Sequence, residues 1–157
     1  IRVQKEFKME NPKDSFELYS DQILLLAGNI PLMDRLESPD FTITRRSKLC
    51  GSLVTIDLTM ANEVITSYGH EVKACVLGQA SAAILAKDVI GKTGREIITV
   101  RNAVVTMLNG SKYHPDIFAD YKFLSPARQF KNRHDSILLS LNATVDAINN
   151  IFKGVNS

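Results

Sequence analysis

The chain has 157 residues, of which 45% are hydrophobic and 23% are charged. This length suits one domain, and the composition excludes a disordered or fibrous protein. The formal net charge of +2 is too small to make nucleic acid or a membrane surface the expected partner. No apolar run is long enough for a membrane span or a signal-peptide core, so we expect a cytoplasmic protein. We predict one domain over residues 1–157, in which residues 1–14 are a flexible start or a remnant of processing or cloning.

The first part of the chain predicts a helix and then an antiparallel sheet. Apolar residues at spacings of three and four indicate a helix from Ser15 to about Gly28; they are Phe16, Tyr19, Ile23 and Leu26. Alternation runs from Phe41 to Thr44 and resumes after Gly51. The resumed run has an apolar face of Val54, Ile56, Leu58 and Met60 and a polar face of Thr55, Asp57 and Thr59. We expect a turn at residues 61–63 and a third strand over residues 64–74, with a bulge at residues 68–70.

The second part of the chain is helical in pattern. A helix rich in small residues begins at Val76, and a further helix from about Arg95 carries Ile98, Val105 and Leu108. Pro115 starts a short element around Phe118 and Tyr121, which we expect to end at Pro126. The last helix has a clear stripe of Ile137, Leu141, Val145, Ile148 and Phe152. Strands followed by helices predict an α+β fold, in which a small antiparallel sheet of about three strands is covered on one face by helices, in two layers.

Residues 91–94 contain a Gly-Lys-Thr sequence of the kind found in phosphate-binding loops. Ala86 stands where that motif needs its first glycine, and the segment follows a helix where the motif follows a strand. We therefore interpret residues 91–94 as a turn that ends a helix.

Cys50 and Cys75 are the two cysteines of the chain, too few for a disulfide scaffold. Each cysteine by itself is typical of a small buried apolar residue. However, Cys50 precedes the second strand and Cys75 follows the third, so antiparallel pairing would set the two thiols side by side. Cys75 also begins a helix, and a helix N-terminus favours the thiolate, the form that binds metal or sulfur.

His134 and Asp135 stand at the start of the last helix. One interpretation is capping, in which Asp135 or Ser136 accepts hydrogen bonds from free backbone N–H groups and His134 is merely exposed. The other is that His134 and Asp135 bring further ligands to the two cysteines. The remaining histidines, His70 and His114, lie in turn-like segments and are expected at the surface.

Three ordered motifs resemble the NifU/IscU/SufU-type scaffolds of iron-sulfur cluster assembly. They are Cys50-Gly51-Ser52 before an apolar strand, Cys75 before Ala80-Ser81-Ala82-Ala83, and Pro126-Ala127-Arg128 leading to Arg133-His134-Asp135-Ser136-Ile137-Leu138-Leu139. The resemblance covers about residues 15–152. It implies helices packed on a small antiparallel sheet. It also implies a non-enzymatic protein that takes sulfur from a cysteine desulfurase, binds iron and passes a [2Fe-2S] cluster to apo-protein acceptors.

The resemblance also assigns a ligand set. Cys50 and Cys75 match two cysteines of the family, and His134 matches the histidine of the third motif. Ser52 occupies the place of an aspartate, and Asp135 occupies the place of the third cysteine. A hydroxyl is a poor ligand for such a cluster and a carboxylate is a harder one than a thiolate. The implied ligands in this chain are therefore Cys50, Cys75, His134 and Asp135.

Three hypotheses follow from this ligand set. We favour a divergent scaffold or carrier whose cluster is held by Cys50 and Cys75 and is completed by His134 and Asp135, or by a second copy of the chain in a homodimer. The alternative is a degenerate family member that binds zinc or no metal and acts as a docking or regulatory partner. A thiol enzyme, with Cys75 as nucleophile and His134 as base, has little support because no oxyanion-forming glycine loop accompanies Cys75.

Six basic residues surround the proposed site in sequence: Arg45, Arg46, Lys48, Arg128, Lys131 and Arg133. The simplest interpretation is that they form solvated faces. The functional interpretation is that they lower thiol pKa values, offset the charge of an anionic cluster and attract an acidic partner.

Overall fold

The computed structural model describes residues 18–49 and 51–156, so Cys50 lies outside the described residues. The elements in chain order are α3 (Asp21–Ala27), β1 (Phe41–Arg46), β2 (Leu53–Ala61), β3 (Val64–Lys73), α4 (Val76–Asp88), α5 (Gly94–Leu108), the 3-10 helices η1 (Ala119–Gln129) and η2 (Lys131–Arg133), and α6 (His134–Asn156). None of the described helices is both long enough and apolar enough to cross a membrane.

The three strands form one antiparallel sheet in the order β1-β2-β3. Asn62 and Glu63 connect β2 to β3 as a two-residue turn, and their φ angles of 53° and 67° are those of the tight turn that suits the twist of a hairpin. The bulge predicted at residues 68–70 is wrong. Those residues pair in regular register, and the irregularity lies where Met60 pairs with Ile65 and leaves Thr66 as the extra residue.

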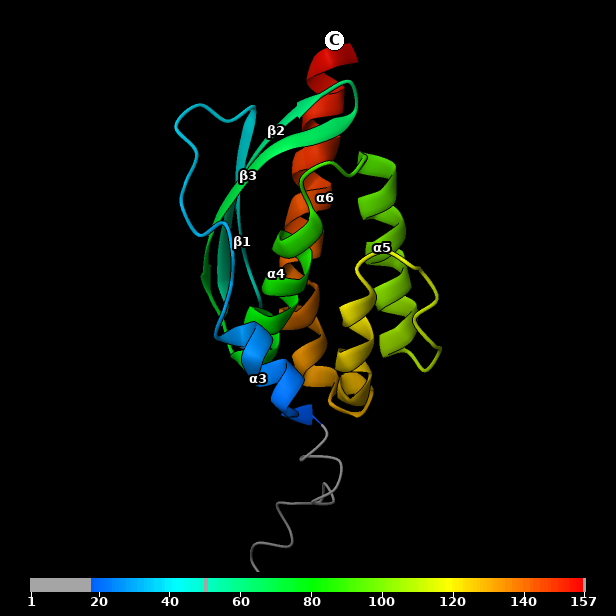
Figure 1. The fold of residues 1–157 in the computed structure, drawn as a ribbon. Helices are drawn as coiled ribbons and strands as arrows, with labels where there is room; N and C mark the ends of the chain where they lie inside the picture. The colour runs from blue at the N-terminus through cyan, green and yellow to red at the C-terminus, as the bar shows by residue number, and fades with distance from the viewer. Residues whose placement is uncertain (1–17, 50, 157) are drawn as a thin grey trace, which may run out of the picture.

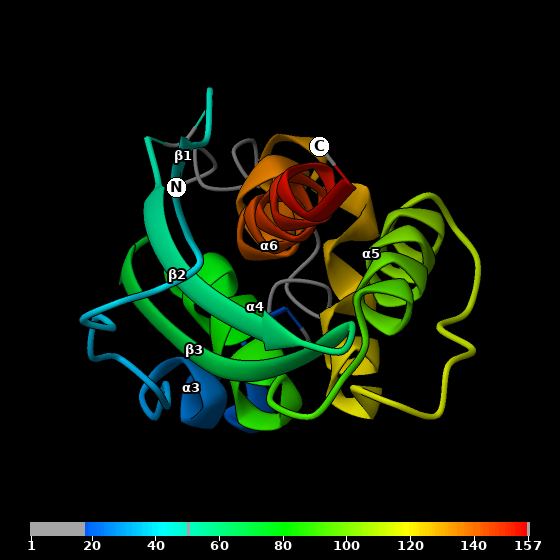
Figure 2. The same ribbon diagram turned by 90° about the horizontal axis from the view of Figure 1, so that it is seen from above.

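The helices cover one face of the sheet, as the sequence predicted. The sheet curves around α6 and α4, and α5 and η1 lie on the side of α6 that faces away from the strands (Figures 1 and 2). The core fills the space between sheet and helices, where the buried residues include Val54, Ile56, Leu58, Leu77, Ile84, Ile97, Leu124, Ile137, Leu141 and Ile148. The fold is therefore α+β, with a three-stranded antiparallel sheet beneath helices.

The outer face of β2 is also covered, which the alternation did not predict. Asp57, expected on a polar face, is fully buried. Its carboxylate accepts hydrogen bonds from Arg35 Nε at 2.6 Å and from the Leu36 N–H at 2.9 Å. Gly69 pairs with Asp57 in the register, and a Cβ at this position would overlap the carbonyl oxygen of Asp34. The segment between α3 and β1 can lie on the sheet because residue 69 is a glycine.

His70 is the second polar residue that the sequence placed wrongly. It was expected at the surface but is fully buried on the inner face of β3, where it pairs with Ile56. The ring Nε2 lies 2.8 Å from the carbonyl oxygen of Pro31, and burial lowers the pKa of His70. His114, in contrast, is exposed as expected.

Three helix boundaries and faces also differ from expectation. Ser20 caps α3 with its side chain and has an extended backbone, so the predicted helix does not run through it. In α5 the predicted residues Ile98 and Val105 are half-buried, because the helix turns the neighbouring stripe of Ile97, Val100, Val104 and Met107 into the core. Pro126 lies inside η1 and does not end it, since the fixed φ of proline fits a 3-10 helix.

Asp57 offers a test of how the segment between α3 and β1 is held against the outer face of the sheet. Burial alone would raise the pKa of Asp57, but hydrogen bonds from Arg35, Thr42 and Leu36 hold it below its ordinary value. We expect Asp57→Asn to lower the free energy of unfolding by about 1 to 3 kcal/mol near neutral pH, because the charge is removed and the donors that face one of the two carboxylate oxygens lose their acceptor. The stabilisation exists above the unfolded pKa of about 3.9 and is lost as the pH falls through the lower folded pKa, so the difference should shrink in acid.

Urea unfolding of the wild type and Asp57→Asn at about pH 7 and about pH 2 checks this expectation. Asp120→Asn is the matched control, because it breaks the exposed pair of Asp120 with Lys87 and should cost less than about 1 kcal/mol. A difference for Asp57→Asn that is as large in acid as at neutral pH would count against the assigned role.

Candidate functional site

The two ends of the β2–β3 hairpin meet the first turn of α6. The register pairs Leu53 with Lys73, so the residues just before β2 and just after β3 lie at the same end of the sheet. The hydroxyl oxygen of Ser136 lies 3.1 Å from that of Ser52 and 3.3 Å from the sulfur of Cys75. The structure thus brings Cys75 and Ser52 together at one point on α6. Cys50, predicted to join them, is outside the described residues.

Cys75 is half-buried at the N-cap position of α4 and is a free thiol. Burial by itself would raise the pKa of Cys75. The hydroxyl of Ser136, the N–H groups of Gly78 and Leu77, and the positive charge of Arg133 outweigh burial and lower the pKa below its ordinary value. The site therefore favours the thiolate, which is the form that binds metal ions and accepts sulfur.

Small residues allow α4 and α6 to approach closely enough for this contact. A Cβ on Gly78 would lie 2.6 Å from the Ser136 hydroxyl oxygen, so this position has no room for a side chain. One turn further along α4, the Ser81 hydroxyl donates to the Ile137 carbonyl oxygen at 2.6 Å. The run of small residues that the sequence showed in this helix thus sets the distance between the cysteine and α6.

His134 is half-buried at the first position of α6. Its Nε2 lies 3.0 Å from the carbonyl oxygen of Ala127 in η1. Because a carbonyl oxygen can only accept, Nε2 is the donor in this contact, and Nδ1 is the other ring nitrogen. A metal-binding histidine commonly uses one nitrogen to bind the metal while a backbone carbonyl orients the other. His134 thus has a backbone carbonyl partner of the kind that orients metal-binding histidines.

Asp135 is exposed and lines a different depression from Cys75. Cys75 shares an open depression of about 490 Å³ with Leu49, Asn132 and Arg133. Asp135 lines a smaller one of about 190 Å³ whose other residues are Arg45, Arg46, Ser47, Lys48, Leu139 and Asn142. Successive helix residues point about 100° apart, so the side chains of His134 and Asp135 diverge from each other and from that of Ser136. Within residues 18–49 and 51–156, no three His, Cys, Asp or Glu side chains form a group that could hold a metal ion.

Two of the basic residues have roles at the site that the sequence could only suggest. Arg133 lines the depression beside Cys75 and also donates to the Tyr19 hydroxyl at 3.2 Å. Arg45 pairs with Asp146 of α6 at the edge of the second depression. Arg128 instead donates to the Ser111 carbonyl oxygen. Arg133 thus lies beside the thiol, Arg45 at the edge of the sheet and Arg128 against a loop.

Ser136 is the residue that sequence reasoning missed, since it was considered only as a helix cap. It is buried and contacts the Cys75 sulfur, whereas Ser140 and Thr144 are buried further along α6. These three hydroxyl residues follow one another at intervals of four in a helix whose buried side is otherwise apolar. This repeat of polar residues on the buried side of α6 is the sequence signal that could have identified Ser136.

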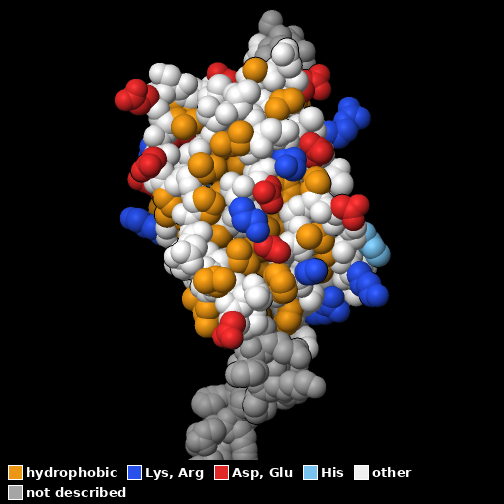
Figure 3. Space-filling model, in the orientation of Figure 1, with side chains coloured by type: hydrophobic (Ala, Val, Ile, Leu, Met, Phe, Trp, Pro, Cys, Tyr) orange, Lys and Arg blue, Asp and Glu red, His pale blue; other side chains and the backbone are white. Residues whose placement is uncertain are grey.

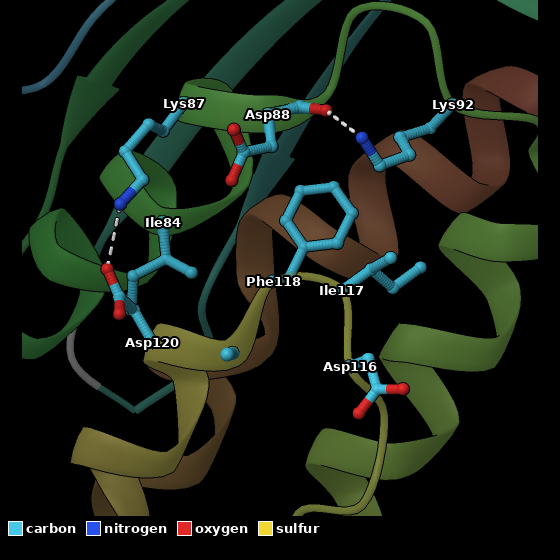
Figure 4. A pocket seen from close by; sticks show the side chains of 9 residues that line it. Ile84, Lys87, Asp88, Lys92, Asp116, Ile117, Phe118 and Asp120 are labelled. Carbon is cyan, nitrogen blue, oxygen red and sulfur yellow. Dashed lines mark hydrogen bonds and ion pairs between the residues drawn. The ribbon is translucent and has the colours of Figure 1, made fainter.

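A further depression, of about 280 Å³, lies at the opposite end of α4 from Cys75 (Figure 4). Lys87 pairs with Asp120 across it, and Lys92 donates to the backbone oxygen of Asp88 while lying 5.5 Å from the centre of the Phe118 ring. Lys92 and Thr93 belong to the Gly-Lys-Thr sequence, and Thr93 forms a capping box with Glu96 of α5. The segment is therefore a turn between helices, as predicted.

The surface gives no sign of one dominant charge on the face shown in Figure 3. Acidic and basic side chains are interspersed there among apolar ones. The most exposed large apolar residues include Leu24 and Leu25 of α3 and Leu49 beside Cys75. This pattern agrees with the small net charge.

The comparisons with known proteins place this geometry in a family. No family model matches the chain. It is 24% identical over 136 residues to the iron-sulfur cluster assembly scaffold protein IscU of Thermotoga maritima, a match that covers 85% of this chain and 94% of that protein. The crystal structure of a nitrogen-fixing NifU-like protein (N-terminal part) from Brucella abortus has 42% identity and a TM-score of 0.87, over 89% of this chain and 98% of that one. This chain belongs to the NifU/IscU-type scaffold family.

A more distant structure supports the NifU/IscU-type fold alone. A candidate scaffold protein for the SUF system from Fervidobacterium islandicum has 19% identity and a TM-score of 0.78, over 85% of this chain and 98% of that one. The resemblance found in the three motifs is thus confirmed at the level of family and fold.

The thiol of Cys75 provides the first test of the site. We expect its alkylation in the metal-free protein to have a midpoint below the ordinary thiol pKa of about 8.5, because Ser136 and Arg133 favour the thiolate. Arg133→Gln should raise the midpoint, and Lys131→Gln, an exposed neighbour, should leave it unchanged. Peptide mass spectrometry after iodoacetamide treatment across a pH series follows Cys75 separately from Cys50. A wild-type midpoint at or above the ordinary value would refute the assigned electrostatics.

Proposed function

We propose that this protein assembles or carries a [2Fe-2S] cluster on Cys50 and Cys75 and passes it to acceptor proteins. The cluster is cargo in this proposal and not a resident cofactor. The observation that carries it is the half-buried Cys75 thiol, whose pKa is lowered and which faces an open depression at the end of the hairpin. Membership of the NifU/IscU-type family supports the same role.

His134 and Asp135 complete the proposed ligand set. Nδ1 of His134 is the nitrogen proposed to bind, because Nε2 contacts the Ala127 carbonyl and imidazole is the common substitute for a thiolate in iron-sulfur clusters. Asp135 is exposed one residue along the helix and would have to reach the cluster from the neighbouring depression. Where it does not, a second copy of the chain supplies the missing ligands, since two cysteines from each of two chains make four. Cys50 enters the proposal from the sequence alone.

The chemistry around the thiol fits transfer better than catalysis. Sulfur from a cysteine desulfurase must reach Cys75 from solvent, and the open depression leaves that approach free. Arg133, with the basic residues at the sheet edge, would offset the negative charge of a cluster and attract an acidic partner surface. The Cys75 sulfur forms its hydrogen bond with Ser136, and the His134 ring forms its hydrogen bond with the Ala127 carbonyl. A thiol nucleophile and its base need a hydrogen bond to each other, which these contacts of Cys75 and His134 do not provide. We therefore propose a binding and transfer protein and not an enzyme.

Reconstitution tests the proposal directly. Anaerobic incubation with iron and sulfide should give a brown protein that contains iron and acid-labile sulfide in equal amounts, and Cys75→Ala and Cys50→Ala should each abolish the colour. Ser140→Ala, which alters a buried hydroxyl further along α6, is the control and should load normally. The mass of the loaded protein in solution tells one chain from two. A colourless wild type that holds stoichiometric zinc, unmoved by iron and sulfide, would instead select a zinc-binding docking or regulatory protein.

Substitutions of Asp135 test whether this residue is a ligand in place of the third cysteine of the family motif. We expect Asp135→Ala to lose its cluster several-fold faster than the wild type when a chelator is added, because one donor is removed. Asp135→Cys should lose it more slowly, since a thiolate is a softer ligand for the cluster. Asp116→Ala, an exposed residue beside the remote depression, is the control. Visible absorbance after chelator addition gives the rates. Indistinguishable rates for the wild type and Asp135→Ala would remove Asp135 from the ligand set.

A further inference from the structure

A pair of buried hydroxyl groups lies beneath the Cys75 sulfur. Ser136 is 1% exposed and Ser52 is 3% exposed, and their oxygens are 3.1 Å apart. Ser136 also lies 3.3 Å from the sulfur. Ser52 is thus connected to the sulfur through Ser136, and its side chain is buried.

The charge on the sulfur fixes the direction of these hydrogen bonds. A thiolate, whether free or bound to a metal, has no proton and can only accept. Ser136 must then donate its one hydroxyl proton to Cys75, which leaves its oxygen to accept from Ser52. The result is a one-way chain of donation from Ser52 to Ser136 to Cys75, in which Ser52 polarises the group that contacts the sulfur.

The surrounding backbone holds this chain in place. Gly78 lies against the Ser136 hydroxyl, at a position where a Cβ would come within 2.6 Å of its oxygen. The Ser52 carbonyl oxygen accepts the Ser47 N–H at 2.8 Å, which anchors the segment before β2. Both hydroxyls thus lie on backbone that is packed or hydrogen-bonded within the protein.

We propose that Ser52 and Ser136 are positioning residues for the Cys75 sulfur and that neither is a metal ligand. The inference rests on the proposed cluster-binding function. It gives Ser52 a task that differs from direct ligation, although Ser52 stands beside the predicted ligand Cys50 in the sequence. Hydrogen bonds to ligand sulfurs raise the reduction potential of an iron-sulfur cluster and limit movement of the thiolate. The chain thus affects both the potential of the cluster and how readily it leaves.

The first test uses the metal-free protein. Ser136→Ala should alkylate at Cys75 about threefold more slowly near neutral pH, because the thiolate loses the hydroxyl donor that stabilises it, and the higher intrinsic reactivity of the remaining thiolate offsets only part of that loss. Ser52→Ala should show a smaller decrease in the same direction. Ser140→Ala is the matched control and should match the wild type. Rates for Ser136→Ala and Ser52→Ala that both equal the control would overturn the proposal. If Ser136→Ala does not fold, Ser52→Ala decides alone.

The second test uses the iron-loaded protein. Ser52→Ala should keep the wild-type iron content and visible spectrum, whereas Cys75→Ala sets the standard for loss of a true ligand. Ser136→Ala should have a more negative reduction potential than Ser140→Ala, which a merely structural substitution would not produce. Iron loss by Ser52→Ala as complete as that by Cys75→Ala would show that Ser52 is a ligand. A wild type that does not load iron would instead defeat the proposed function, and the alkylation rates would still decide the role of the hydroxyl chain.

Discussion

The contact between Cys75 and Ser136 is the interaction on which the site depends. It joins residues 61 positions apart and exists because three separate elements end at one place. The β2–β3 register brings the two ends of the hairpin together, Gly78 allows α4 to approach α6, and the first turn of α6 then places a hydroxyl under the sulfur. A change in any of these three elements would leave Cys75 as an ordinary half-buried thiol.

Much of this arrangement could be predicted from local sequence. Alternation in β2 and the turn at Asn62 determine which ends of the hairpin meet, and these are short-range properties of the backbone. Asp57 and His70 could not be placed in this way, because each is buried by the irregular segment between α3 and β1, which has no period from which its position could be inferred. Ser136 was missed for a related reason, since its role depends on the distance between two helices and not on its own neighbours.

The proposed metal ligands of this chain differ from those of the family motif. A scaffold has to hold its cargo firmly enough to assemble it and loosely enough to release it. In the proposed ligand set, Asp135 is a harder donor than the cysteine of the family motif, and His134 contacts the Ala127 carbonyl through Nε2, so Nδ1 is the nitrogen proposed to bind. Arg133 and Ser136 lower the pKa of the Cys75 thiol. The family indicates the general task, and we propose that these residues affect how tightly this chain holds its cargo.

The central claim is that folding brings the sulfurs of Cys50 and Cys75 within reach of one metal centre. Treatment of the metal-free monomer with dibromobimane, a reagent that becomes fluorescent when it links two nearby thiols, measures this proximity most directly. The account predicts one intramolecular bridge per chain, identified by mass spectrometry as a peptide that joins Cys50 to Cys75, and no bridge after denaturation in excess reagent. Separate single adducts on the two cysteines of the folded chain would contradict it.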